Sequence, residues 1–229
     1  MGCSVVDAPS CAVLIPAYNE ASTVEAVIRV ALAADVGPVV VVDDGSSDDT
    51  AAVATRAGAL LLRLDDNRGK GGALEAGARS RSEDVLVLLD ADLTGLLPAH
   101  VRELAEPVRS GLADMTRGVF VGGRWATTAA QRLAPQLAGQ RGVLRHLLLE
   151  VPGLSTSRYG VEVAITDHAQ RSEWRSVEVL LPGVSQITKE EKRGLVRGLF
   201  IRLRMYLEIV RQVIRRKRDD GNPGSPGGA

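Results

Sequence analysis

The sequence predicts an α/β fold, in which a mostly parallel β-sheet is flanked by helices. Short apolar runs alternate with amphipathic helical patterns through the first half of the chain, which is typical of strand–helix–strand units. The runs are continuously apolar, as expected for strands buried on both faces. With 229 residues, 45% of them hydrophobic and 24% charged, the chain is long enough to bury a full core.

The first half is expected to contain four strands joined by helices. The strands are predicted at 12–15, 38–42, 59–64 and 85–89. Helices are predicted at 21–33, 49–57 and 73–80, with residues 67–72 as a loop. The first helix shows its period clearly, because Val24, Val27 and Ile28 fall on one stripe.

From about residue 115 onward the alternation of strands and helices is less regular. Strands are expected at 116–121, 161–166 and 177–181, and a helix at 127–136. The predicted organisation is a leader at 1–10, a folded domain at 11–190 whose halves are 11–115 and 116–190, a basic amphipathic helix within 191–218, and a disordered tail at 219–229.

The late segment 188–218 is basic, although the whole chain has no net charge. It holds eleven Lys/Arg and three Asp/Glu, whereas the remainder holds 17 basic and 25 acidic residues. Within it, residues 194–218 carry one apolar stripe at helical spacing, with arginines on the other faces. Two alternatives stay open: the stripe docks on this chain's own core or on a second copy in a homodimer, or the helix lies on an anionic membrane.

The composition favours a cytoplasmic protein, with peripheral contact at the inner face of the membrane as an open alternative. Cys3 and Cys11 cannot form a disulfide framework. The opening residues lack a signal-peptide pattern, and no apolar run reaches the length of a membrane span. No nucleic-acid partner is expected.

Polar clusters follow each of the four predicted strands in the first half. They read PAYNE (16–20), DDGSSDD (43–49), NRGKGG (67–72) and DAD (90–92). Parallel sheets bind ligands beyond the carboxyl ends of their strands, so the four clusters should meet at one edge. The sequence therefore predicts a binding site there.

The acids Asp90 and Asp92 end the most apolar of these strands. On one side of an extended segment they can share a Mg²⁺ or Mn²⁺ ion, and such an ion on a diphosphate would assist departure of a nucleoside diphosphate. The alternative is that they only cap the following turn or helix.

Asp44 is placed to accept a hydrogen bond from a nucleotide base, whereas Ser46, Ser47 and Asp48 suit the start of the next helix. Lys70 suits contact with a phosphate, although its segment also fits a plain helix entry and is not a Walker P-loop.

Together, LIPAYNE (14–20), VVDDGSSDDT (41–50), NRGKGGALEAGA (67–78) and LLDADLTGL (88–96) resemble a family 2 glycosyltransferase with the GT-A fold. The resemblance covers about residues 1–120. It implies a nucleoside-diphosphate sugar as donor, a divalent metal, and transfer of the sugar to an acceptor hydroxyl or phosphate. By the same resemblance the donor would be bound by Pro16, Ala17, Tyr18, Glu20, Asp44, Lys70, Asp90, Ala91 and Asp92, with Asp92 on the metal.

The second half bears a fainter resemblance to glucosyl-3-phosphoglycerate synthases and to dolichol-phosphate mannose synthase-like enzymes. It implies that Tyr159 and Glu162, in the YGVE element, bind the acceptor, and that Glu162 joins Asp90 and Asp92 as a catalytic residue. Arg141, on an acceptor loop, would meet an acceptor phosphate. Gln186 stands where these relatives place a metal-binding histidine. The three histidines, His100, His146 and His168, are scattered and are interpreted as structural.

A second class of function remains open, namely a catalytically silent GT-A domain that binds a membrane or a partner. Gln186 and the basic segment favour it. A sugar-phosphate nucleotidyltransferase is set aside, because PAYNE lacks the glycines and the basic residue that its first loop requires. The sugar, the base, the acceptor and the stereochemical outcome are not determined by these residues.

Overall fold

The computed structural model describes residues 9–121, 139–156 and 160–186. The helices predicted at 127–136 and 194–218, the leader, the tail and Tyr159 lie outside these residues.

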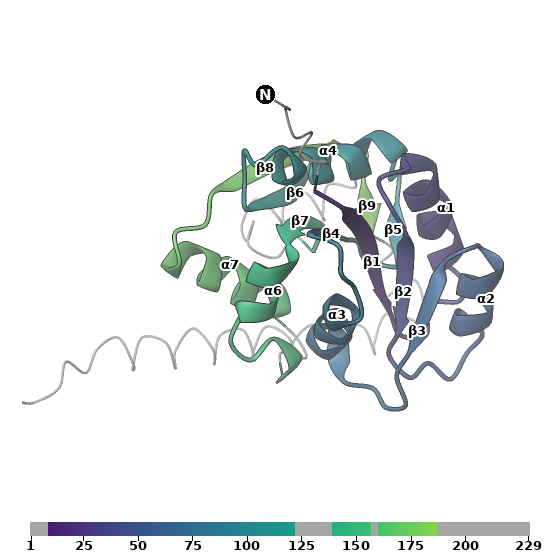
Figure 1. Ribbon diagram of the computed structural model, residues 1–229. Helices are drawn as coiled ribbons and strands as arrows, with labels where there is room; N and C mark the ends of the chain where they lie inside the picture. Colours follow the sequence, from purple (N-terminus) through teal and green to yellow (C-terminus); the bar gives the residue numbers. More distant parts are fainter. Residues whose placement is uncertain (1–8, 122–138, 157–159, 187–229) are drawn as a thin grey trace, which may run out of the picture. The chain divides into compact units, whose positions relative to one another are not determined.

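A seven-stranded, mostly parallel sheet forms the centre of the described chain (Figure 1). Its strands are β1 (Cys11–Ala17), β2 (Val39–Asp43), β3 (Leu60–Arg63), β4 (Val85–Leu88), β6 (Met115–Val121), β7 (Arg141–Leu144) and β8 (Ser176–Pro182). The spatial order is β3-β2-β1-β4-β7-β6-β8, and only β7 runs antiparallel to its neighbours. A separate pair, β5 (Leu93–Thr94) and β9 (Ser185–Gln186), is antiparallel. The predicted fold class is confirmed.

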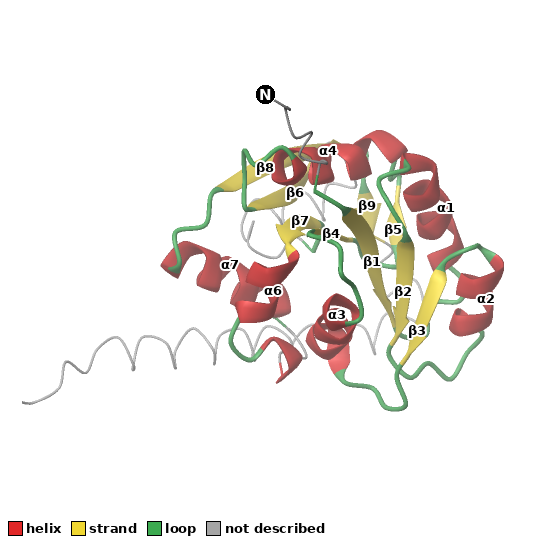
Figure 2. Ribbon diagram, viewed as in Figure 1, coloured by secondary structure: helices red, strands yellow, loops and turns green. Residues whose placement is uncertain are grey.

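Helices cover both faces of the sheet, as Figure 2 shows. The helices are α1 (Val24–Ala34), α2 (Thr50–Arg56), α3 (Gly69–Arg79), α4 (Pro98–Arg109), α6 (Arg145–Glu150) and α7 (Val161–Arg171), with a 3₁₀ turn at Leu154–Thr156. One core packs α1, α2 and α4 against the sheet, and the other packs α3, α6 and α7. Alternate residues of β1 enter opposite cores, which explains why its sequence is apolar throughout.

The central strands β1 and β4 are almost completely buried. In their register Ala12 lies opposite Leu86 and Leu14 opposite Leu88, and all four side chains are at most 2% exposed. Each buried leucine of this kind contributes about 1.5–3 kcal/mol of hydrophobic free energy. This packing fixes where β4 ends, and so where the acidic residues after it lie.

The region around residues 161–166 is a helix, so the predicted strand is wrong. Its residues Val161, Val163 and Ile165 alternate in a way that suggests a strand. The apolar side chains that are buried are instead Val161, Ile165 and Ala169, which are spaced four apart. Gly160 precedes the helix with φ of 104°, a backbone conformation that glycine adopts easily. The helical period therefore prevailed over the β-branched composition.

Two further predictions need correction. Residues 69–72 are not loop, because α3 begins at Gly69 and its glycines pack closely: a Cβ at Gly72 would lie 2.5 Å from the Cβ of Arg68. Arg141 is not on a loop either, because it opens strand β7, which pairs with both β4 and β6. In the part of the chain that the structure describes, no helix has the length and apolarity needed to cross a membrane.

Candidate active site

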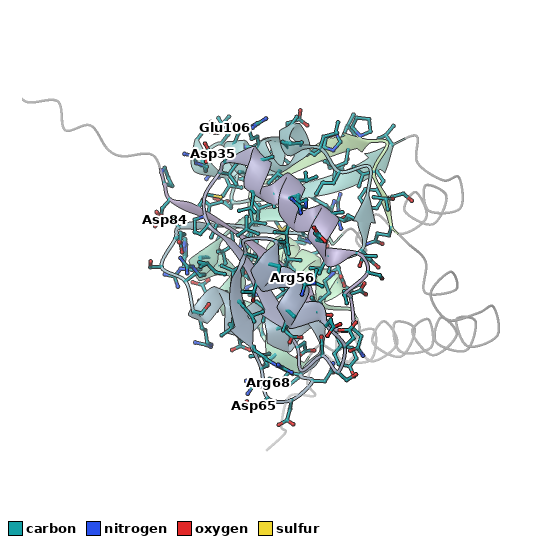
Figure 3. The ribbon with its side chains drawn as sticks, turned by 90° about the vertical axis from the view of Figure 1, so that its right-hand side faces the viewer. Asp35, Arg56, Asp65, Arg68, Asp84 and Glu106 are labelled. Atoms are coloured by element: carbon teal, nitrogen blue, oxygen red, sulfur yellow. The ribbon has the colours of Figure 1, made fainter. Side chains whose placement is uncertain are left out.

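The polar clusters do meet at one edge of the sheet. The loops after β1, β2 and β4 and the start of α3 all lie at the carboxyl ends of the parallel strands. Figure 3 shows the two ends of the sheet: Asp65 and Arg68, in the loop leading to α3, lie at one end, and Asp35 and Glu106 at the other. The four-cluster edge is the one near Arg68.

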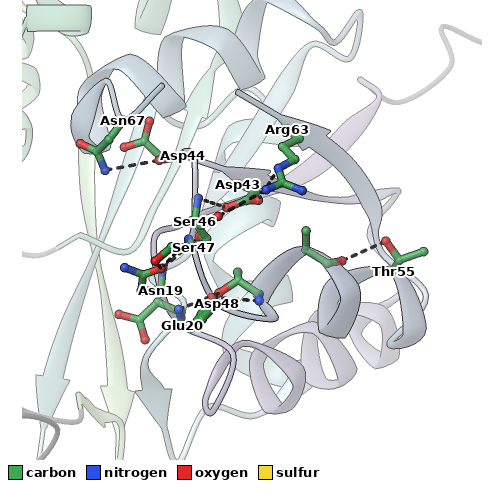
Figure 4. Close-up of polar contacts among 12 residues, drawn as sticks. Asn19, Glu20, Asp43, Asp44, Ser46, Ser47, Asp48, Thr55, Arg63 and Asn67 are labelled. Atoms are coloured by element: carbon green, nitrogen blue, oxygen red, sulfur yellow. Dashed lines mark hydrogen bonds and ion pairs between the residues drawn. The ribbon is translucent and has the colours of Figure 1, made fainter. Parts of the chain in front are cut away.

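The loops after β1 and β2 are joined by hydrogen bonds centred on Asn19 (Figure 4). The backbone N–H of Asn19 donates to Ser46 Oγ at 2.9 Å, and its side-chain Oδ1 accepts from the backbone N–H of Ser47 at 2.9 Å. Asn19 has φ of 55°, a left-handed conformation that asparagine tolerates better than most residues. The sequence reasoning missed Asn19, although an asparagine in a strand-end loop is the available signal.

Of the three residues predicted to cap α2, only Asp48 bonds to the start of the helix, although the N-cap residue itself is Asp49. Oδ1 of Asp48 accepts the Thr50 N–H at 3.0 Å, at the start of α2, and its Oδ2 accepts the Ala21 N–H at 3.2 Å. Ser46 and Ser47 are engaged with Asn19, so their predicted capping of α2 is wrong. Their contacts instead hold the two loops together.

Asp44 stabilises the start of α3. Its two carboxylate oxygens accept the backbone N–H groups of Arg68 at 2.7 Å and Gly69 at 2.8 Å, and the residue is 3% exposed. A carboxylate at a helix N-terminus also interacts favourably with the helix dipole. The neighbouring Asp43 is fully buried and accepts the Ser46 N–H.

The residues predicted to line the nucleoside pocket lie along the end of β1 and in the loop after it. Pro16 pairs with Val42 in the sheet, Ala17 is 3% exposed, and the Tyr18 side chain is 46% exposed. Glu20 accepts a hydrogen bond from Thr23 Oγ1 at 2.8 Å, and its backbone N–H donates to Thr50 Oγ1. Tyr18 is therefore the residue of this segment that presents an aromatic ring to solvent.

Asp90 is held by donors from three separate segments. Lys70 Nζ lies 2.5 Å from Oδ1, while Gln140 Nε2 and Gln186 Nε2 donate to Oδ2 at 2.9 and 2.5 Å. The Asp90 side chain is 14% exposed. Such donors replace the water that a carboxylate loses on burial. The apolar strand can therefore end on an acid without a metal ion to compensate it.

Lys70 links Asp90 to Glu162. Its ammonium lies 2.5 Å from a carboxylate oxygen of each, across 92 residues of sequence in the case of Glu162. Burial alone would lower the pKa of Lys70, but the two carboxylates outweigh it, so the pKa is raised above its ordinary value. Lys70 is therefore a fixed positive charge at the site.

Asp92 and Gln186 lie on neighbouring segments. Asp92 is partly buried and directly precedes β5, and Gln186 pairs with Leu93 across the β5–β9 ladder. Ala91, between the two acids, is 5% exposed and belongs to the core. Among the described residues there is no cluster of three His, Cys, Asp or Glu side chains suited to a metal ion.

Arg141 lies in the interior and not on the surface. Its side chain is completely buried and donates to the carbonyl of Glu162 at 3.0 Å and to Thr166 Oγ1 at 2.8 Å. Burial lowers the pKa of Arg141 to about 10, so the guanidinium is still protonated at neutral pH. Arg141 thus anchors the first turn of α7, which carries Glu162 to the site.

Two of the histidines have structural contacts. His100 is 3% exposed, and its Nδ1 accepts the Leu97 N–H at 3.2 Å at the start of α4. His168 packs edge-on against Trp174, with ring centroids 5.4 Å apart. His146 is exposed.

A mostly parallel sheet with polar loops after β1 and β2 and an Asp-x-Asp pair after β4 is the arrangement of a GT-A domain. The sequence model of Glycosyl transferase family 2 matches residues 12–162, which is more than half of the chain. The chain belongs to this family.

Individual relatives agree with this assignment. Glycosyltransferase AglD of Haloferax volcanii is 41% identical over 118 residues, which are 46% of this chain and 19% of that protein. Glucosyl-3-phosphoglycerate synthase of Mycobacterium tuberculosis is 30% identical over 191 residues, 67% of this chain and 58% of that protein. The chain thus spans about a fifth to three fifths of the length of these two relatives.

A solved structure shows the same architecture. The M. tuberculosis glucosyl-3-phosphoglycerate synthase, in complex with Mn²⁺, UDP-glucose and phosphoglyceric acid, superposes with a TM-score of 0.61 at 27% identity. The match covers 78% of this chain and 72% of that one.

Proposed function

We propose that the chain is a metal-dependent glycosyltransferase that moves a sugar from a nucleoside-diphosphate donor to an acceptor hydroxyl or phosphate. The observation that carries this proposal is the cluster at the carboxyl end of β4, where Asp90, Lys70 and Glu162 form one ion-paired group beside Asp92. Family membership and the UDP-glucose complex of a structural neighbour support it.

The residues fit Mg²⁺ or Mn²⁺. Both ions take oxygen ligands, and Mg²⁺ in particular often binds one or two carboxylates together with substrate phosphates. Asp92 would supply the carboxylate, and Gln186 the oxygen of its side-chain amide, since its nitrogen donates to Asp90. When bound, the ion would neutralise charge on the leaving diphosphate.

The protein groups have separate tasks in this proposal. The nucleoside is bound by Pro16, Ala17, Tyr18, Glu20 and Asp44. Asp44 accepts hydrogen bonds from the start of α3 and would also accept one from the base. Lys70, Asp90 and the backbone at Ala91 bind the rest of the donor. Glu162 and Tyr159 are proposed to bind the acceptor. Arg141 is buried, so it acts by placing Glu162.

Donor binding tests the proposal directly. Calorimetry with UDP-, GDP- and dTDP-linked sugars, with and without Mn²⁺, should show binding of one nucleotide class that depends on the metal. Saturating ligand should also stabilise the fold by a few kcal/mol in a thermal shift. Silence across the whole panel would rule the enzyme out.

One observation favours the alternative of a catalytically silent module. Gln186, on β9, stands where the resemblance implies a metal-binding histidine, and an amide is a weaker metal ligand than an imidazole. Replacing Asp90 and Asp92 with alanine separates the two functions. The enzyme would lose transfer, whereas a binding module would keep its activity in a partner- or vesicle-binding assay.

We further propose that the basic segment within 191–218 docks on the chain's own core or on a second copy of the chain, with binding to an anionic membrane as the alternative. Each Lys or Arg near an anionic surface contributes about 1 kcal/mol, so binding should weaken with salt. Sedimentation with anionic vesicles, comparing the full chain with one ending at Arg193, tests the membrane role. Unfolding of the shorter chain would favour docking on the chain's own core instead, and loss of a dimer would favour a second copy.

A further inference from the structure

Gln140 lies at the centre of the Asp90 cluster. Its side-chain Nε2 donates to Asp90 Oδ2 at 2.9 Å, the same oxygen that accepts from Gln186, while Lys70 occupies Oδ1. Each of these three donors comes from a different segment: α3, the residues just before β7, and β9.

The backbone around Gln140 is built closely against this contact. The carbonyl of Gln140 accepts the Gly118 N–H at 2.8 Å, which ties the residue to β6. A Cβ added at Gly139 would lie 2.5 Å from Asp90 Oδ2 and 2.8 Å from Lys70 Nζ. Only glycine at 139 therefore lets the chain approach the ion pair so closely.

The amide of Gln140 is not explained by packing. The residue is fully buried, and its Oε1 has no hydrogen-bond partner among the described residues. Burying an unsatisfied amide oxygen is costly, and a methionine would fill the space without that cost. The reverse orientation of the amide would set Oε1 against the Asp90 carboxylate. The contact that accounts for an amide here is the one from Nε2 to Asp90.

We propose that Gln140 is a positioning residue that, with Gln186, fixes the Asp90 carboxylate in the orientation that binds the nucleotide-sugar donor. This inference rests on the proposed function. The two amide N–H groups hold Oδ2, and Lys70 holds Oδ1, so the carboxylate plane is set before a donor arrives. Gln140 acts through Asp90 and does not itself touch the donor.

The test compares two replacements of Gln140 with a matched control. Gln140→Met keeps the length of the side chain and removes the N–H group that bonds to Asp90. Gln140→Glu keeps the shape of the side chain and adds a charge that repels Asp90. The control, Gln170→Met, alters an exposed glutamine on α7. Affinity is measured by calorimetry with Mn²⁺ and UDP-glucose, GDP-mannose or dTDP-glucose, using whichever the wild type binds most tightly. Circular dichroism and thermal unfolding check that each variant is folded.

We expect Gln140→Met to weaken donor binding about 10–100-fold, as is usual for groups that orient a ligand-binding side chain. Gln140→Glu should weaken it further, and Gln170→Met should leave it unchanged. In an Asp90→Asn background, Gln140→Met should cost less than about threefold, because two residues that act through one contact are not additive.

Three results overturn the inference. The first is a folded Gln140→Met variant that binds the nucleotide sugar as tightly as the wild type. The second is a loss of affinity on Gln140→Met that is just as large in the Asp90→Asn background, which would indicate a general packing effect. If Gln140→Met does not fold, the Gln140→Glu variant decides in the same way. No binding by the wild type to any of the three sugars would instead overturn the proposed function, and this role with it.

Discussion

The Asp90 cluster is built differently from the nucleoside edge, which is the pair of loops 17–21 and 44–50 that we propose to bind the nucleoside. At the nucleoside edge, loops 17–21 and 44–50 are joined mostly by bonds between backbone N–H groups and small polar side chains, as at Asn19 and Asp48. The Asp90 cluster is held by charged and amide side chains that come from 20 to 96 residues away in the sequence.

The contacts in the two regions serve different purposes, one in folding and the other in the reaction. The loop contacts at the nucleoside edge satisfy backbone groups that any fold must satisfy. The Asp90 cluster gathers three ionised side chains where burial makes them costly unless they are paired. Changes of Asn19 or Asp48, which join the two loops, should therefore act mainly on stability. Changes around Asp90 and Asp92 should act on activity, and those that break an ion pair should act on stability as well.

The largest effect on activity is expected from Asp92→Asn. It removes a charge that the metal would require, so turnover should fall about 100-fold or more while the protein stays folded. Steady-state kinetics at saturating Mn²⁺, with circular dichroism as a check of folding, measure this. A loss no greater than that of Asp48→Ala would place the site elsewhere.

The sequence predicted the two regions unequally. In the first half, strand ends such as 43–49 and 90–92 carry local signals: an apolar run stops and acids or glycines follow. The contacts that complete the cluster have no local signal. Neither Lys70 to Glu162 nor Gln140 to Asp90 can be seen before α7 and β7 are in place. The same holds for Arg141, whose burial depends on packing against α7.

Prediction of secondary structure from short patterns failed where a segment fits both the two-residue period of a strand and the spacing of a helix. Residues 161–166 fit a strand by alternation and a helix by spacing of four, and tertiary burial decided the outcome. Gly69–Gly72 suggested a flexible loop. There the close packing of α3 and the Asp44 cap at its start outweigh the low helix propensity of glycine.

Lys70→Met should cost the most stability. It leaves the Asp90 and Glu162 side chains, 14% and 16% exposed, without their shared cation, at a cost on the order of 2–3 kcal/mol. Urea unfolding measures the difference. Because folding raises the pKa of Lys70 above its ordinary 10.5, this contribution is complete below pH 10.5 and is lost as the pH rises through the folded value.

The control for this prediction is Arg79→Met, which breaks an exposed i,i+4 pair with Glu75. It should cost less than about 0.5 kcal/mol. Equal costs for Lys70→Met and Arg79→Met, or a Lys70 contribution that does not change up to pH 12, would mean that the ion pairs around Asp90 contribute no more than surface pairs.

Gln186→His should have a moderate effect, in the opposite direction. An imidazole is a stronger ligand for Mn²⁺ than an amide oxygen, so half-maximal donor binding should require about tenfold less Mn²⁺. A Mn²⁺ titration of donor binding tests this. An unchanged Mn²⁺ requirement would show that position 186 is not at the metal and only orients Asp90.

The smallest effect on activity is expected from Asp48→Ala, which loses the N–H contacts to Thr50 and Ala21. Because Asp48 is exposed, the cost in stability should be about 0.5–1 kcal/mol, near the low end for a helix cap.

Burial raises the pKa of Asp48, but the hydrogen bonds from Thr50 outweigh it and the pKa is lowered overall. The contribution is therefore present above about pH 4 and lost as the pH falls through the lower folded value. Urea unfolding at pH 7 and pH 3 should show a smaller difference in stability between the variant and the wild type at pH 3. Turnover at pH 7 should be unchanged, and a loss approaching that of Asp92→Asn would mean that Asp48 itself takes part in the reaction.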